Sequence, residues 1–184
     1  MDKIDMLSLT EENKYFFLDQ LKNELCNRFE TTVEELPELY GYAKSWSLLS
    51  LVESNNIDTY QLLYVNDKIW TGSGGMIREF QGEKIYQSGF RAFSVQEHRH
   101  TGLGVNAYMH QYSSTYQITR AKQFGCTSVI WSFDPHNYRL FQVNWKYLIP
   151  KAFPNFKFTI HEEPVEFNNS PQHLIILDLT KNLV

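Results

Sequence analysis

Arg99-His100-Thr101-Gly102-Leu103-Gly104 is the stretch around which the rest of this sequence can be interpreted. A strand-like segment, 85–95, precedes it, and a segment with helical spacing, 105–124, follows it and ends before Gly125. The first turn of a helix leaves about four backbone N–H groups without partners, and the helix dipole adds about half a positive charge there. Glycines let backbone approach a phosphate closely, and Arg99 adds a full positive charge. The order strand, glycine loop, helix therefore predicts a phosphate-binding loop rather than a plain surface loop.

The segment 102–107, Gly-Leu-Gly-Val-Asn-Ala, also fits the dinucleotide fingerprint Gly-x-Gly-x-x-Ala. That motif opens a parallel βαβ unit in which an acid about 20 residues further on holds the ribose. Here the nearest acid after the next strand-like segment is Asp134, about ten residues too late for that role. The segments before the loop also look like consecutive antiparallel strands. A dinucleotide-binding domain is therefore the weaker alternative.

Hydrophobic periodicity and turn residues predict the order of elements along the chain. We expect helices from Thr10 to about Asn27, after Thr32, over 105–124 and from Asp134 to Pro150, and strands over 4–9, 60–65, 68–80, 84–95, 127–133, 156–160 and 173–179. The turns 66–67 and 81–83 join neighbouring strands, and a polar loop, 162–171, joins the last two. This order predicts an α/β fold with a mixed, mostly antiparallel central sheet flanked by helices.

Three local features refine this expectation. Asp134-Pro135 predicts a helix start, with the aspartate as N-cap and the proline in the first helical position. The segment Gly72-Ser73-Gly74-Gly75 interrupts a strand pattern, which predicts either a β-bulge or a wall of a substrate site. On the segment 105–124, a tyrosine-rich face that continues to Thr115 and Thr119 is expected to pack into the core.

Length and composition bound the class of protein. A chain of 184 residues with 42% hydrophobic and 15% aromatic residues predicts one packed domain, 1–184. The net charge of −4 provides no electrostatic case for binding nucleic acid. The sequence has no apolar run of about 20 residues, so we expect no membrane-spanning helix, and residues 1–5 do not resemble a signal peptide. The two cysteines, Cys26 and Cys126, do not form a disulfide framework, which favours a cytoplasmic location.

The loop resembles the pyrophosphate loop of the GNAT superfamily of N-acyltransferases, whose signature is Gln/Arg-x-x-Gly-x-Gly/Ala. Arg99, Gly102 and Gly104 match that signature position for position. The similarity extends over about residues 58–153, because 66–77 resembles the turn and third strand of the family and 124–137 its fifth strand with flanking segments. The resemblance implies a transferase that uses acetyl-CoA as co-substrate and acetylates an amine of a small molecule or peptide.

The resemblance also implies which residues contact the coenzyme. The backbone of 93–95 would run beside the pantetheine arm, with the N–H of Val95 bonding the thioester oxygen. Backbone N–H groups of 100–105 would hold the pyrophosphate. The coenzyme-binding residues expected on this basis are Phe93, Ser94, Val95, Arg99, His100, Thr101, Gly102, Leu103, Gly104, Val105 and Asn137.

The catalytic residues are less directly indicated. Glu97, just beyond the strand, is the candidate general base, with surface pairing to Arg99 as the alternative role and His136 as a second base candidate. Many members of the family carry a proton-donating tyrosine seven residues after the asparagine that follows the fifth strand. That position is Asn144 here, so Tyr147, one turn further along, is the expected proton donor.

The departure at Asn144 leaves a second class of function open, a non-catalytic acyl-CoA-binding or regulatory module with the same fold. His98 and His100 alternate in the loop, but the sequence supplies no third ligand at a suitable spacing, so no metal site is predicted. We expect no nucleic-acid or membrane partner. An edge strand near the C-terminus could pair two copies into a homodimer.

Overall fold

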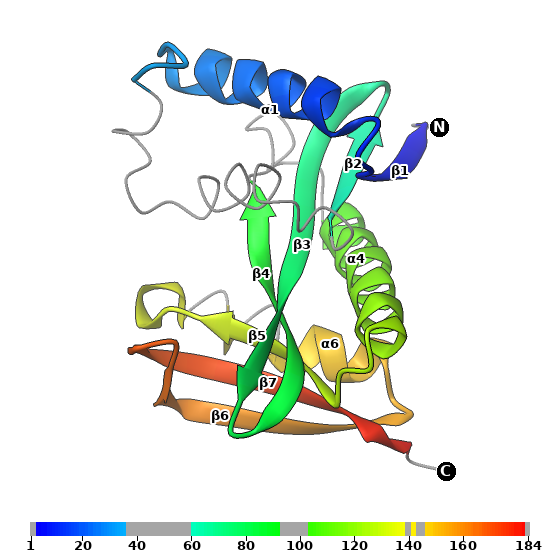
Figure 1. Ribbon diagram of the computed structural model, residues 1–184, viewed down its shortest axis with the longest axis vertical. Coiled ribbons are helices and arrows are strands. Elements are labelled where there is room, and N and C mark those ends of the chain that lie inside the picture. Colours follow the sequence, from blue (N-terminus) through cyan, green and yellow to red (C-terminus); the bar gives the residue numbers. More distant parts are fainter. Residues whose placement is uncertain (1–2, 36–59, 93–102, 139–140, 143–145, 183–184) are drawn as a thin grey trace. The chain divides into compact units, whose positions relative to one another are not determined.

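The computed structural model describes residues 3–35, 60–92, 103–138, 141–142 and 146–182 (Figure 1). Their contacts form two compact units, Met1–Gly74 with Phe90–Val105 and Gly75–Gly89 with Asn106–Val184, and β3 and β4 contribute to both. The elements in chain order are β1 (Ile4–Ser8), α1 (Lys14–Phe29), β2 (Gln61–Val65), β3 (Lys68–Phe80), β4 (Glu83–Ala92), α4 (Leu103–Gln123), β5 (Ser128–Phe133), the 3₁₀ helix η3 (Pro135–Asn137), α6 (Lys146–Ala152), β6 (Phe156–Phe167) and β7 (Ser170–Asn182). The expectation of a single domain stays a prediction.

The strands follow the order β1-β2-β3-β4-β5-β7-β6. β4 and β5 pair in parallel, and the pairings described for β1 with β2, β2 with β3, β5 with β7 and β6 with β7 are antiparallel. The predicted mixed, mostly antiparallel α/β fold is therefore confirmed. None of the described helices is long and apolar enough to cross a membrane.

Tight turns join three pairs of strands, and in each both central residues have positive φ. The values are 51° and 62° at Asn66-Asp67, 52° and 77° at Gln81-Gly82, and 54° and 61° at Asn168-Asn169. Positive φ at both positions is the type I′ geometry that matches the twist of a hairpin. The first two turns fall where the sequence predicts them.

The prediction of a polar loop over 162–171 is wrong. β6 continues to Phe167 and β7 starts at Ser170, so most of this segment is a long hairpin. The run of acids had indicated a loop, but β6 is an edge strand, and edge strands tolerate charged residues and proline. The register of β6 shifts between His161 and Val165, where Pro164 cannot donate a ladder hydrogen bond.

In the unit that contains β1, α1 packs on β2. The rings of Phe17 and Tyr64 contact each other edge to face, with centroids 5.7 Å apart. The Tyr64 hydroxyl donates to Oε1 of Gln20 at 3.0 Å, and burial raises the pKa of Tyr64 to about 12. Phe16 is 63% exposed, because the contact face of α1 passes through its neighbour Phe17.

At both N-terminal helix starts that the sequence predicts, a threonine side chain accepts from an N–H three residues further on. The Thr10 N–H donates to Oδ1 of Asn13 at 2.7 Å, and the Asn13 N–H donates back to Oγ1 of Thr10 at 3.3 Å, although regular helix begins only at Lys14. The Glu35 N–H donates to Oγ1 of Thr32 at 3.3 Å. The helix expected after Thr32 continues beyond the described residues.

In the other unit, α4 and α6 pack on one face of the sheet. This closed face is built by the buried side chains Tyr86, Ile118, Ala121, Cys126, Val129, Trp131, Phe133, Phe141, Ile149, Ile175 and Leu177. A smaller cluster lies on the opposite face and contains Ile85, Ile130, Phe167 and Leu174. Alternate residues of β4, β5 and β7 therefore serve two separate clusters, as the period of two in a strand requires.

Two helix predictions need correction in this unit. Thr115 and Thr119 are exposed, and α4 instead buries Ser114, Gln117, Ile118 and Ala121. The tyrosines of the expected face, 108 and 112, have side chains outside the described set. Pro150 lies inside α6, which continues to Ala152. Pro150 is the fifth of the seven residues of α6, so its missing N–H removes one intrahelical hydrogen bond, the one to the carbonyl of Lys146.

The first half of the glycine segment of β3, Gly72 and Ser73, pairs with β2 without a bulge. The pairing of Ser73 with Gln61 and Gly72 with Leu62 is regular, and the irregularity instead places Trp70 as the extra residue opposite Leu63 and Tyr64. Gly75 is packed so tightly that an added Cβ would collide with the Tyr86 ring and lie 2.5 Å from the carbonyl oxygen of Gln87.

We predict that Gly75→Ala lowers the free energy of unfolding by about 3 kcal/mol, because a backbone oxygen cannot move away as a side chain can. Gly82→Ala is the control, since its Cβ would meet nothing within 4 Å and only the positive φ of 77° is strained, at about 1 kcal/mol. Urea denaturation measures the free energy of unfolding of both variants. A Gly75 variant no less stable than the Gly82 variant would contradict the packing argument.

Candidate functional site

The parallel pair β4–β5 is the feature of the fold that points to a site. The described register runs from Ile85↔Ser128 to Ser88↔Trp131, and β4 continues to Ala92 and β5 to Phe133. In a parallel pair, the carboxyl ends of both strands lie at the same edge of the sheet. Ligands of α/β proteins commonly bind outside that edge, so the segments that follow β4 and β5 are candidates for ligand binding.

The segment that follows β4 carries the predicted phosphate loop. Phe93, Ser94, Val95, Glu97 and Arg99–Gly102 lie outside the described residues. α4 begins at Leu103, two residues earlier than expected, so Gly104 and Val105 belong to its first turn. Residues 103–106 include no acid, and the first-turn N–H groups of a helix are free to bind an anion.

The segment that follows β5 is held by the predicted cap. The Asp134 carboxylate accepts a hydrogen bond from the His136 N–H at 3.0 Å, and Pro135 occupies the first position of η3. The interpretation of Asp134 as an N-cap is therefore confirmed. His136 is exposed, and Asn137 is the last residue of η3.

A buried polar pair ties β4 to the helix that follows it. Ser88 is fully buried and Gln117 is 1% exposed, and the Ser88 hydroxyl donates to Oε1 of Gln117 at 2.6 Å. Trp131, the register partner of Ser88, buries its indole N–H, and Ser114 buries its hydroxyl; neither has a hydrogen-bond partner among the described residues. The sequence analysis missed these polar groups, because their position becomes visible only when the two strands pair.

A cluster of aromatic and charged side chains lies where β5 pairs with the start of β7. His173, opposite Phe133 and 5% exposed, stacks on Phe141 at 5.1 Å and lies 4.8 Å from the ring of Tyr138. Its Nδ1 is 2.6 Å from the carbonyl oxygen of Glu162. Because a carbonyl can only accept, Nδ1 carries the proton in this pair. The sequence analysis missed His173 as well, since it looked like one more residue of a strand.

Charged groups border this cluster. Lys146 forms an ion pair with Glu162, and this pairing raises the pKa of Lys146. Tyr147, the expected proton donor, is 63% exposed, and its ring lies 5.7 Å from the ammonium group of Lys146. Among the residues that the structure describes, no three histidine, cysteine or acidic side chains gather as a metal site would require.

Sequence comparisons do not place the chain in a family. No family model matches it, and no curated protein matches it significantly.

Comparison with solved structures does find similar folds. FeeM, an N-acyl amino acid synthase from uncultured soil microbes, matches with a TM-score of 0.54 and 12% identity over 98% of this chain and 93% of that chain. The aminoglycoside acetyltransferase AAC(6')-Ib, solved with coenzyme A and kanamycin, matches with a TM-score of 0.54 and 12% identity over 97% and 96%. A Bordetella pertussis protein described as a putative GnaT-family acetyltransferase matches with a TM-score of 0.52 and 12% identity over 96% of both chains. This chain has the GNAT fold. The resemblance inferred from the sequence is confirmed for the fold.

We predict that Ser88→Ala lowers the free energy of unfolding by about 1–3 kcal/mol, because it leaves Oε1 of Gln117 buried without a donor. The double variant Ser88→Ala/Gln117→Leu removes both partners and should recover part of that loss. Chemical denaturation of the unmodified protein, of Ser88→Ala and Gln117→Leu and of the double variant measures this. A double variant less stable than the sum of the two single changes would contradict the buried pair.

Proposed function

We propose that this protein is an acetyl-CoA-dependent N-acetyltransferase that moves an acetyl group to a primary amine of a small molecule or peptide by direct attack on the thioester. The observation that carries the proposal is the combination of Arg99, Gly102 and Gly104 with the start of α4, in a chain with the GNAT fold. Outside a coenzyme site, a basic glycine loop at this place in the fold has no evident use.

The residues present fit the coenzyme. The N–H groups of the first turn of α4, from Leu103 onward, face no acid in that turn, and Arg99 adds a guanidinium that suits a pyrophosphate. Phe93–Val95 follow β4 in the sequence, and we assign their backbone to the pantetheine arm. Several of the solved structures that share the fold contain coenzyme A or acetyl-CoA, which agrees with a ligand of this kind.

The proposed reaction needs three things from the chain. An alkyl amine with a pKa of about 10.4 is mostly protonated at neutral pH, so Glu97, or His136 in its place, removes a proton to free the lone pair. The amine nitrogen attacks the thioester carbon, and the N–H of Val95 stabilises the oxygen that becomes negative. After the C–N bond has formed, the nitrogen releases its second proton to solvent and the C–S bond breaks. Tyr147 gives its proton to the departing thiolate and regains one from solvent.

One observation favours a second function. The proton-donor position of many GNAT enzymes is Asn144 here, and Tyr147 is an exposed residue beside Lys146. A protein that binds acyl-CoA and transfers nothing would need neither residue. Coenzyme binding without turnover over a broad amine panel would identify this alternative, a non-catalytic acyl-CoA-binding or regulatory module.

Calorimetric titration with acetyl-CoA tests the coenzyme site, with NADH as the ligand control. We expect micromolar binding of acetyl-CoA alone, and we expect Gly104→Asp to abolish it, because the new carboxylate clashes with and repels the pyrophosphate. Thr115→Asp is the matched control, since it adds the same charge to an exposed position of the same helix. Undiminished affinity in the Gly104 variant would overturn the phosphate-loop assignment, and binding of NADH would favour the dinucleotide alternative.

Steady-state kinetics over a pH series test the catalytic roles. If Tyr147 protonates the thiolate, Tyr147→Phe lowers kcat by about 100-fold or more with little change in KM for acetyl-CoA. Glu97→Gln should alter the pH dependence of the rate, since it removes the group that takes the amine proton. Tyr15→Phe, at a position of similar exposure on α1, is the control. Unchanged kcat in the Tyr147 variant would show that the thiolate takes its proton from water.

A further inference from the structure

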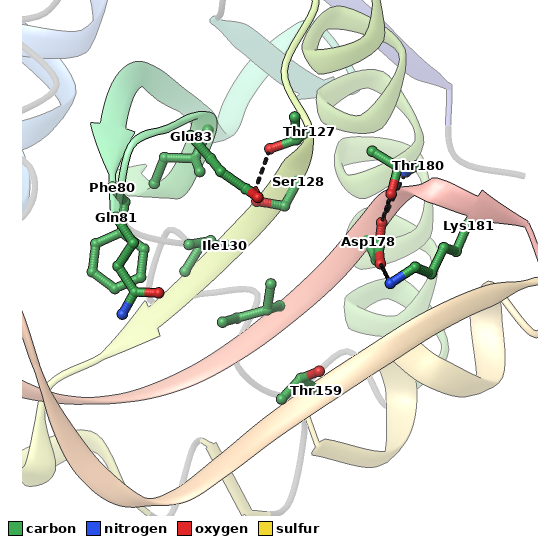
Figure 2. A pocket seen from close by; sticks show the side chains of 12 residues that line it. Phe80, Gln81, Glu83, Thr127, Ser128, Ile130, Thr159, Asp178, Thr180 and Lys181 are labelled. Carbon is green, nitrogen blue, oxygen red and sulfur yellow. Dashed lines mark hydrogen bonds and ion pairs between the residues drawn. The ribbon is translucent and has the colours of Figure 1, made fainter.

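A cavity of about 310 Å³ opens on the face of the sheet opposite α4 and α6 (Figure 2). Its lining comes from the end of β3, the β3–β4 turn, β4, Thr127 before β5, and β5, β6 and β7, and all of these lining residues belong to one of the two compact units. The lining residues are Phe80, Gln81, Glu83, Ile85, Thr127, Ser128, Ile130, Thr159, Ile176, Asp178, Thr180 and Lys181. Cavities of this size accommodate small organic molecules.

Two rungs of the sheet build the floor of this cavity. Ile85 pairs with Ser128, and Ser128 pairs with Asp178 on the next strand. In the neighbouring rung Ile130 pairs with Ile176. Side chains directly opposite each other on one face have Cβ atoms about 5 Å apart, so these residues form one continuous surface. The surface is apolar in the middle and carries a hydroxyl beside a carboxylate along one edge.

Ser128 is the residue that points to a ligand. It is 7% exposed as a residue and contributes to the lining of the cavity. A hydroxyl needs a partner from the protein, from water or from a ligand, because leaving it without one costs about 1–3 kcal/mol. Here the hydroxyl lines a cavity, where a bound molecule can supply that partner.

The charged groups of the lining determine which kind of molecule the cavity can bind. Hydrogen bonds from the Thr180 hydroxyl and N–H, at 2.6 and 2.9 Å, lower the pKa of Asp178 and keep it ionised. The carboxylate of Glu83, the first residue of β4, accepts from the Thr127 hydroxyl at 2.9 Å. Among the described lining residues Lys181 is the single cation, and its side chain is 65% exposed at 3.5 Å from Asp178. An exposed pair of this length is weak, so a ligand can displace it.

We propose that this cavity binds an organic ammonium ion with a small apolar body. The ammonium group would donate to Asp178 and to the hydroxyl oxygen of Ser128, while the apolar body covers Ile130 and Ile176 against Phe80. Carboxylate and hydroxyl oxygens accept ammonium hydrogens, and the apolar floor excludes a fully hydrated inorganic ion. This site is separate from the carboxyl edge of β4 and β5, since it includes the first paired residues of both strands, Ile85 and Ser128.

NMR titration of ¹⁵N-labelled protein with 2-phenylethylamine, in the absence of acetyl-CoA, tests the proposal. We expect saturable shifts of the amides of 127–130 and 176–181. The neutral isostere 2-phenylethanol should bind at least about tenfold more weakly, because it lacks the charge. The two compounds share the same ring, so the difference between their affinities measures the contribution of the carboxylates to binding.

Three variants sharpen the test. Asp178→Asn should weaken binding of 2-phenylethylamine about tenfold. Lys181→Gln should strengthen it about threefold, since it removes the competing cation. Glu163→Gln, an equal change of charge at an exposed position of β6 outside the lining, should leave the affinity unchanged.

Three results would overturn the proposal: no shift up to the solubility limit of the amine, equal binding of amine and alcohol, or shifts confined to 134–138. The last result would locate amine binding at the carboxyl edge and would support the proposed acyl acceptor site instead. The Lys181 variant keeps the test decisive if Asp178→Asn fails to fold, because a gain of affinity cannot come from unfolding.

Discussion

The parallel pairing of β4 with β5 is the constraint on which the rest of this structure depends. Two parallel strands cannot be joined by a hairpin, so the chain must cross back over the sheet between them, and α4 makes that crossing. The crossing places the start of α4 after the carboxyl end of β4, where the glycine loop lies in the sequence. The hydrogen bond between Ser88 and Gln117 ties the helix to the strand beneath it. The position of the proposed phosphate loop before this helix therefore follows from the topology as much as from the glycines.

The same pairing separates two faces with different chemistry. The face toward α4 and α6 is closed by large apolar side chains such as Trp131 and Phe141, and its few polar groups are fully buried. The opposite face has a smaller apolar cluster and the cavity lined by Ser128 and Asp178. Adjacent residues of β5, Ser128 and Val129, therefore contribute to different surfaces, as alternation in a strand requires. One sheet can thus carry two unrelated ligand sites.

The successes and failures of sequence analysis have identifiable physical causes. The hairpins at 66–67 and 81–82 were predictable, because asparagine, aspartate and glycine tolerate the positive φ of a type I′ turn. Asn168-Asn169 forms the same turn and was missed, since the acids before it suggested a loop and hid the strand that precedes it. The prediction of which face of α4 packs into the core was also wrong, because threonine and tyrosine at this spacing are compatible with a core and with a surface. Pro150 was taken as a helix end, although α6 continues for two residues beyond it.

The sequence by itself determined the order of elements, the caps at Thr10 and Asp134, the glycine loop and the GNAT fold that follows from them. These features depend on local rules, the period of a helix or strand and the conformational preferences of turn residues, which a single chain displays directly. Only the tertiary structure decided which residues meet. Ser128 lies beside Asp178, fifty positions away in the chain, and His173 lies against Phe141 and Glu162. Such neighbours follow from strand register, which is set by long-range packing and leaves no mark at either residue alone.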